Sequence, residues 1–177
     1  MKNHDSFIAT KRIRLCVPIR RQSCIDRFSL WLSKNRIYTN AEVMFLHILR
    51  PNWFDETPYC SSQAARLLDL QDMITAETER EFRAVAKRLE NLYPALSVSV
   101  KVIAQRLDGE TIAQMATEWN SDTILLFAQE KTTIEKLFER DLIKETIDSA
   151  KCSIQIIQPE RQESKTKERE KFRAALE

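Results

Sequence analysis

Three arginines have the type and the expected placement to bind an anion in this 177-residue chain. Arg20 and Arg21 follow an apolar segment, residues 12–19, and Arg140 lies in a later segment with helical periodicity. Guanidinium groups bind phosphates and carboxylates through paired, charge-assisted hydrogen bonds. If the segment ends meet at one edge of a sheet, the three side chains form a site for a small anion or nucleotide. The alternative is that Arg140 forms a surface ion pair with a neighbouring glutamate, which contributes little energy.

Two apolar positions border the same expected cleft. Ile48 ends a near-continuous apolar run, residues 41–49, and Phe127 ends another, residues 122–128. Such runs are typical of strands that are covered on both faces. We therefore expect Ile48 and Phe127 to lie beside Arg20. The sequence does not decide whether the cleft between them is open, filled by side chains or occupied by a ligand.

Histidine and cysteine chemistry has little support in the sequence. With two histidines in the chain, no Ser-His-Asp or Cys-His arrangement can be argued, and His47 is interpreted as a hydrogen-bonded core residue. The four cysteines are widely spaced and form no metal-binding pattern. We expect Cys16 and Cys152 to be buried and inert in strands, whereas Cys60 lies in a loop and is the one candidate for a reactive thiol. No enzyme activity, cofactor or metal is expected.

A single glycine, Gly109, stands where average usage would give roughly a dozen. Phosphate-binding loops need two or three glycines close together, so that backbone N–H groups can approach the phosphate. A Walker loop and a dinucleotide-binding fingerprint are therefore excluded. The Ser-Gly-Gly-x-Asp-Ser loop that pyrophosphatase-type nucleotide enzymes carry after their first strand is also absent, because residues 20–23 read Arg-Arg-Gln-Ser.

Charge is distributed unevenly along the chain. Residues 1–36 hold nine Lys or Arg and two Asp, whereas the remainder has an excess of acidic residues. A basic front could contact an anionic partner or an acidic surface, or could consist of solvated flanks. Residues 159–177 are almost all charged and could dock on a protein partner, for example a transporter or another cytoplasmic complex. A nucleic-acid role is unlikely because no recognition motif is present.

Targeting and membrane signals are absent from the pattern. The start Met-Lys-Asn-His-Asp is polar and no apolar signal region follows it. No apolar run approaches the 18 residues that a membrane-spanning helix needs. We therefore expect a cytoplasmic protein with reduced thiols and no membrane insertion.

Strands and amphipathic helices alternate along residues 12–158. Strands are expected at 12–19, 41–49, 97–104, 122–128 and 152–157. Helices are expected at 23–35, from about 62 to 93 with a break near 70–75, at 110–119, and after a capping box at 132–135. This order predicts an α/β fold, a five-stranded parallel sheet with helices on both faces. Residues 1–11 are expected to form a flexible lead.

Two helices carry more detailed expectations. Asp108 should cap the helix at 110–119 with its carboxylate. The inward face of the long helix should share one stripe, formed by Ile74, Thr78, Phe82, Val85, Leu89 and Leu92.

Five local signatures occur in order at compatible spacing. They are Val17-Pro18-Ile19-Arg20, Leu46-His47-Ile48, Gly109-Glu110, Asp122-Thr123-Ile124-Leu125-Leu126 and Ala150-Lys151-Cys152. In this respect residues 12–158 resemble the universal stress protein family. The resemblance implies a Rossmann-like sheet of the adenine-nucleotide hydrolase type and a regulatory, non-enzymatic role.

The ATP-binding branch of that family carries the motif Gly-x2-Gly-x9-Gly-(Ser/Thr) after the fourth strand. Its glycine positions fall here on Phe127, Glu130 and Arg140, and its hydroxyl position falls on Asp141. An aspartate that helps to hold the nucleotide in that branch is replaced by Arg20. The acidic residues would repel phosphates, and the bulkier side chains would fill the space that phosphates need. The resemblance therefore implies no ATP binding in the usual manner.

A homodimer is also implied by the resemblance, commonly through pairing of the last strand across a twofold axis. Residues 153–158 would provide that edge, with Ile154, Ile156 and Gln158 at the interface.

Overall fold

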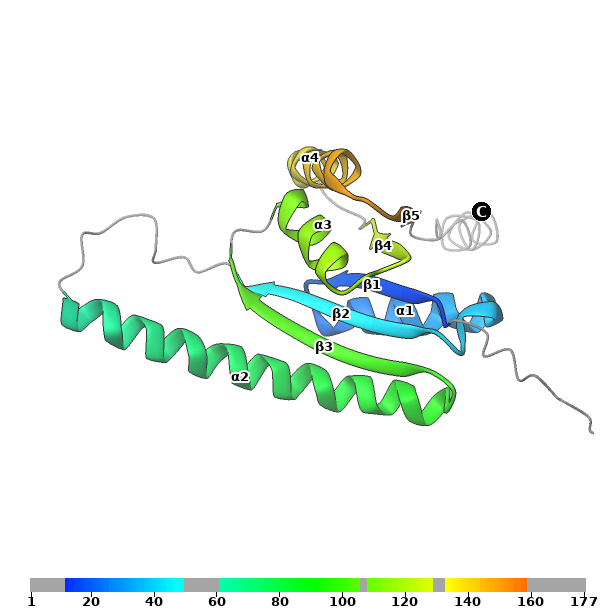
Figure 1. Cartoon of the computed structure of the whole chain (residues 1–177), viewed down its shortest axis with the longest axis horizontal. Coiled ribbons are helices and arrows are strands. Elements are labelled where there is room, and N and C mark those ends of the chain that lie inside the picture. The colour runs from blue at the N-terminus through cyan, green and yellow to red at the C-terminus, as the bar shows by residue number, and fades with distance from the viewer. Residues whose placement is uncertain (1–11, 50–60, 106–107, 129–132, 159–177) are drawn as a thin grey trace, which may run out of the picture.

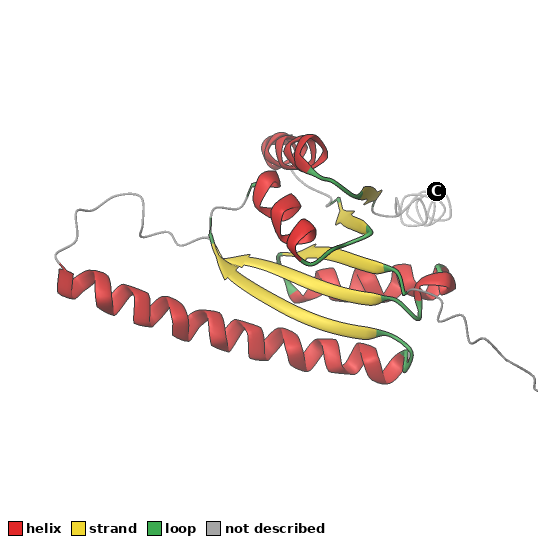
Figure 2. Ribbon diagram, in the orientation of Figure 1, coloured by secondary structure: helices red, strands yellow, loops and turns green. Residues whose placement is uncertain are grey.

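The computed structural model describes residues 12–49, 61–105, 108–128 and 133–158, with side chains described outside 61–64 and 133–140. The expectations for the lead 1–11, the loop thiol Cys60, the capping box 132–135 and the tail 159–177 lie outside the described residues or side chains. Within the described residues, five strands alternate with helices, ten elements in all (Figures 1 and 2). They are β1 (Arg14–Ile19), α1 (Gln22–Lys34), η1 (Arg36–Tyr38), β2 (Glu42–Leu49), α2 (Ser61–Leu92), β3 (Ser97–Ala104), α3 (Gly109–Glu118), β4 (Thr123–Phe127), α4 (Thr133–Ser149) and β5 (Ser153–Ile157).

The five strands form one parallel sheet in the order β3-β2-β1-β4-β5. This confirms the predicted fold class. β1 lies at the centre, where Leu15 is in register with Val43 of β2 and with Thr123 of β4. The strand order reverses between β1 and β4. Ligands of open parallel sheets bind beyond the carboxyl ends of the strands at such a reversal.

Two hydrophobic layers cover the sheet, because alternate strand residues point to opposite faces. Helices α1 and α2 pack on one face, and α3 and α4 pack on the other (Figure 1). The first layer includes Leu15, Val17, Phe28, Phe45, Phe82 and Leu125. The second includes Cys16, Met44, Leu46, Ile112, Ile124 and Leu126. The side chain of Asp108 accepts a hydrogen bond from the Thr111 N–H at 2.8 Å, so the predicted helix cap is confirmed.

Helix α2 runs unbroken for 32 residues, so the predicted break near residues 70–75 is wrong. The stretch contains neither glycine nor proline, and its β-branched pair Ile74 and Thr75 lowers helix propensity by only tenths of a kcal/mol, roughly. The prediction that Leu92 lies on the inward face of the helix is also wrong, since 69% of Leu92 is exposed. Ala86, which was not predicted on that face, is buried. The amino-terminal half of α2 extends past the ends of the strands (Figure 1).

Glu90 joins the end of α2 to the start of β3. Its Oε1 accepts a hydrogen bond from the Val98 N–H at 3.0 Å, and its Oε2 lies 3.1 Å from Lys87 Nζ. The bond from Val98 lowers the pKa of Glu90 below its ordinary value, assisted by Lys87, although partial burial opposes the shift. The ionised carboxylate therefore stabilises the fold above the pKa of the unfolded state, and this contribution is lost as the pH falls through the lower folded-state pKa.

Glu90→Gln should therefore destabilise the protein by about 1 kcal/mol at neutral pH. The difference from wild type should shrink toward zero at an acidic pH below the lowered folded-state pKa, where the carboxyl group is protonated in both states. Urea unfolding at the two pH values measures it, with Glu81→Gln, an exposed position on the same helix, as control. A loss that is equal at both pH values would show that the charge of Glu90 is not what matters.

Candidate functional site

The amino end of α1 lies at the strand reversal. β1 ends at Ile19, Arg20 and Arg21 follow as exposed residues, and α1 begins at Gln22. Arg21 occupies the N-cap position in an extended conformation and provides no side-chain cap. The Arg21 carbonyl accepts a hydrogen bond from the Cys24 N–H at 2.9 Å, but neither arginine side chain forms a hydrogen bond or ion pair with a described residue.

Phe127 and Arg27 cover the carboxyl end of β4. The Phe127 ring meets the Phe28 ring nearly edge-to-face, with centroids 6.4 Å apart. The Arg27 guanidinium carbon lies 5.5 Å from the centroid of Phe127, a cation–π distance. Arg27 Nη2 also donates a 2.6 Å hydrogen bond to the carbonyl of Ala128. The chain's own side chains thus occupy the space beside the last residue of β4.

Phe127 is held by an aromatic cluster within the core. Phe28 is fully buried at the centre of this cluster. The centroid of the Phe28 ring lies 5.4 Å from that of Phe45 and 5.8 Å from that of Trp31. Aromatic pairs at these separations stabilise each other by about 0.5–1.5 kcal/mol beyond their buried area. Moving Phe127 would therefore disturb the packing of α1 on the sheet.

Arg27 is the site residue that the sequence did not single out. It precedes the buried Phe28 and lies one helical turn before the buried Trp31, at the border of the apolar face of α1. An arginine at such a border can lay its aliphatic stem on apolar surface and keep its charged end near polar atoms. This position at the border of the apolar face could have indicated a role for Arg27. It could not have identified the Ala128 carbonyl, 101 residues away, as the hydrogen-bond acceptor.

His47 connects β2 to the end of β1. Its Nδ1 lies 2.8 Å from the Ile19 carbonyl, and since a carbonyl only accepts, Nδ1 carries the proton. The ring also packs against Phe82 with centroids 4.8 Å apart. The interpretation of His47 as a hydrogen-bonded structural residue is confirmed, although it is half-buried rather than fully enclosed.

The other predicted cleft residues lie apart. Ile48 is 9% exposed and belongs to the core layer under α3, whereas Phe127 packs against the α1 layer. The side chain of Arg140 lies outside the described side chains. Of the residues predicted to bind a ligand, the structure brings together Arg20 and Arg21 at the end of β1.

Cys16 and Cys152 are poor nucleophiles. Cys16 is fully buried, and burial raises its pKa strongly, with a smaller contribution from Cys152. Cys152 was expected to be buried in a strand, but it precedes β5 and is half-buried. Burial and then the charge of Asp122 raise its pKa. Both thiols are therefore protonated at neutral pH, which agrees with their expected inertness.

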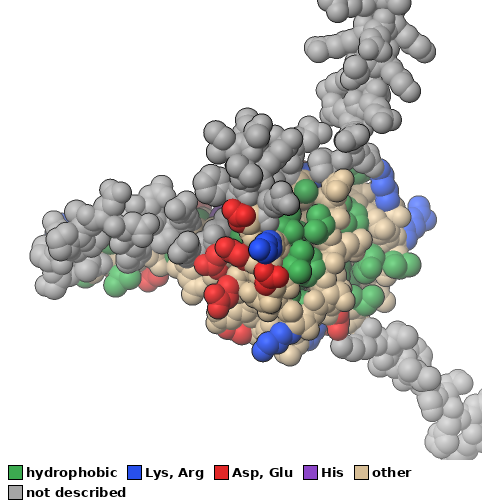
Figure 3. All heavy atoms as spheres, turned by 90° about the horizontal axis from the view of Figure 1, so that it is seen from above, with side chains coloured by type: hydrophobic (Ala, Val, Ile, Leu, Met, Phe, Trp, Pro, Cys, Tyr) green, Lys and Arg blue, Asp and Glu red, His purple; other side chains and the backbone are tan. Residues whose placement is uncertain are grey.

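β5 is the edge strand of the sheet on the α4 side. One edge of β5 pairs with β4, and no described strand pairs with the other. Ile154 is half-buried in the α3 layer, Ile156 is 41% exposed, and Gln158 is exposed. Ile147 of α4, which the sequence analysis missed, is 51% exposed. Figure 3 shows hydrophobic side chains gathered on this side of the molecule.

The described residues contain no group of three or more His, Cys, Asp or Glu side chains that could hold a metal ion. None of the helices in the described part of the chain has the length and hydropathy to cross a membrane.

Comparison with known proteins identifies the fold. No protein-family model and no curated protein matches the chain by sequence. Solved structures do match: UspA from Lactobacillus plantarum, a universal stress protein, superposes with a TM-score of 0.58 at 16% identity, covering 83% of this chain and 99% of its own.

Two further structures agree with this match. A universal stress protein from Archaeoglobus fulgidus gives a TM-score of 0.51 at 12% identity, over 82% of this chain and 93% of its own. The hypothetical protein MJ0577 gives a TM-score of 0.60 at 15% identity, over 84% of this chain and 97% of its own. The chain therefore has the fold of the universal stress proteins.

Proposed function

We propose that this chain is a non-enzymatic interaction module on the universal stress protein fold, which forms a homodimer and does not bind ATP in the usual manner. The observation that carries this proposal is the covered end of β4. Arg27 and Phe127 fill the place where a nucleotide-binding relative is expected to have the first glycine of its phosphate loop.

Glycine at that position would let the backbone approach a phosphate without a side chain in between. Phe127 instead joins the aromatic cluster around Phe28, and Arg27 donates to the Ala128 carbonyl. Uncovering the end of β4 would cost both the aromatic packing and a charge-assisted hydrogen bond, each of which contributes roughly 1 kcal/mol or more. This cost opposes binding of a nucleotide at the end of β4.

The edge strand β5 supports the proposed homodimer. An exposed strand edge is a template for pairing with another chain, and a twofold axis lets the same edge serve both copies. Ile154 and Ile156 lie on one face of β5, so two paired strands would bring four isoleucines together. We further propose that the module works in the cytoplasm, and that a protein partner binds the charged residues 159–177.

A second candidate function is a sensor for a small anion. The side chains of Arg20 and Arg21 have no partner among the described residues, and they flank the amino end of a 13-residue helix that lacks a side-chain cap. Helix amino ends attract anions through free N–H groups and the helix dipole. The sequence prediction adds Arg140 to this candidate site.

A thermal-shift screen separates the two candidates. We expect MgATP and other nucleotides to leave the melting temperature unchanged, because a ligand that does not bind the native state cannot stabilise it. A rise with phosphate or another small anion that disappears in Arg20→Ala and Arg21→Ala would favour the sensor. Arg36→Ala, an exposed arginine on η1, is the matched control. Stabilisation by MgATP in wild type would contradict the proposed module.

A further inference from the structure

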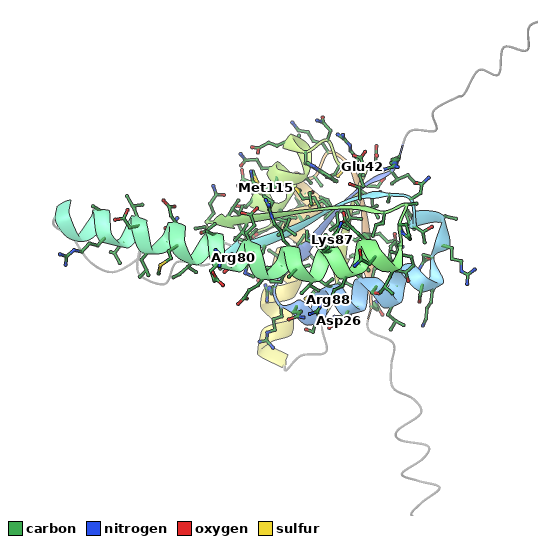
Figure 4. The ribbon with its side chains drawn as sticks, turned by 90° about the horizontal axis from the view of Figure 1, so that it is seen from below. Asp26, Glu42, Arg80, Lys87, Arg88 and Met115 are labelled. Atoms are coloured by element: carbon green, nitrogen blue, oxygen red, sulfur yellow. The ribbon has the colours of Figure 1, made fainter. Side chains whose placement is uncertain are left out.

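The first turns of α2 expose an apolar surface that the sheet does not cover. We call residues 61–77 the α2 arm. Within it Leu70 is 39% exposed and Met73 is 63% exposed. The buried residues of α2 are Phe82, Ala86 and Leu89, all in its carboxyl-terminal half. Figure 4 shows that the helix preceding Arg80 extends beyond the sheet.

Four arm residues form a single stripe with opposite charges at its two ends. Arg66, Leu70, Met73 and Glu77 are separated by four, three and four residues. With 3.6 residues per turn, this spacing keeps them on one line along the helix, the 4-3-4 pattern of a coiled-coil seam. The stripe is rotated by about 150° from the face that buries Phe82, so it does not continue the core-facing stripe.

We propose that the α2 arm pairs antiparallel with the α2 arm of a second copy of this chain. In that arrangement Arg66 faces Glu77 of the second copy, and Leu70 faces Met73 of the second copy. The twofold axis repeats both contacts, so two ion pairs enclose two apolar layers. Parallel pairing would place like charges against each other at both ends of the stripe.

The charged ends of the stripe can form these contacts. Arg66 is exposed and has no ion pair with a described residue. Glu77 forms an ion pair with Arg80 one turn away on α2, and the Glu77 side chain is 57% exposed. A carboxylate has acceptor sites for more than one guanidinium, so Glu77 can hold both Arg80 and an incoming Arg66.

This second contact is smaller than the proposed β5 interface and independent of it. Two apolar layers and two exposed ion pairs correspond to a weak association, with a dissociation constant of about 100 µM. At low concentration the chain would be the β5 dimer, and at high concentration two dimers would join through their arms. The arm contact is best measured where β5 pairing has been removed, in the full-length Ile156→Asp variant.

Sedimentation velocity of Ile156→Asp from about 5 to about 500 µM tests the arm contact, since this range spans the expected dissociation constant. The mass should rise from monomer toward dimer. Adding Leu70→Asp and Met73→Asp should abolish the rise, whereas Leu92→Asp, an exposed apolar position of α2 outside the arm, should leave it unchanged. Circular dichroism confirms that each variant keeps its helix.

Charge reversal provides the specific test of register. Arg66→Glu or Glu77→Arg alone should weaken the association about tenfold, because each turns both ion pairs into like-charge contacts. The double variant R66E/E77R should restore the association. The proposal is overturned if the Ile156→Asp protein stays monomeric over the whole range, if the rise survives L70D/M73D, or if the double reversal is no better than the single ones. If wild type is already monomeric at about 5 µM, the β5 interface fails while the arm test stands.

Discussion

Gly109→Ala should lower the free energy of unfolding by about 3 kcal/mol, although alanine is the better helix former. A Cβ at this position would lie 2.2 Å from the backbone nitrogen of Thr146 and 2.5 Å from the Cβ of Glu145. Both belong to α4, which cannot yield locally because Thr146 is fully buried. Gly109 is needed for the close approach of α3 to α4, and its N–H donates to Glu145 Oε2 at 3.0 Å.

Calorimetric melting or urea unfolding measures this effect. A loss of about 3 kcal/mol corresponds to a melting temperature lower by about 6–12 °C in a chain of this size. Glu110→Ala, at the next and exposed residue, is the control and should change stability by less than about 0.5 kcal/mol. A Gly109→Ala protein as stable as wild type would mean that the two helices are not packed this closely.

Ile156→Asp should halve the mass of the protein measured by light scattering at about 5 µM, where the weaker arm contact does not form. Ile156 is 41% exposed on the edge strand, so the substitution leaves the folded monomer intact. In the proposed dimer it would bury two unpaired carboxylates near the twofold axis, each at a cost of several kcal/mol. The dissociation constant should rise at least about 1000-fold.

The control for this experiment is Ile37→Asp, because Ile37 is 77% exposed on η1, away from β5. Its mass should equal that of wild type. An unchanged mass for Ile156→Asp would remove β5 from the interface, and a wild-type monomer at the same concentration would remove the homodimer itself.

The fold was predictable because its signals are local. Strand β3 begins and ends at Ser97 and Ala104 as expected from alternating β-branched residues. The apolar runs that became β2 and β4 predicted strands covered on both faces, and Asp108 marked the start of α3. Each of these patterns lies within a few neighbouring residues.

The site was less predictable because its contacts join distant residues. Arg27 and Ala128 are far apart in the sequence, and no local pattern pairs them. The clash that Gly109 avoids depends on Glu145 and Thr146, which only the packing of α3 against α4 brings near. Helix α2 continues unbroken past the sheet because its residues have adequate helix propensity, and not because that part has a buried face. The amphipathic pattern therefore did not predict the unbroken helix.

We propose that Phe127 and Arg27 occupy the place of a phosphate-binding glycine, so that this fold is retained without its usual nucleotide site. Isothermal titration calorimetry of the full-length protein with MgATP tests this proposal most directly. No binding heat above the heat of dilution is expected. Saturable binding with a dissociation constant in the micromolar range would contradict it.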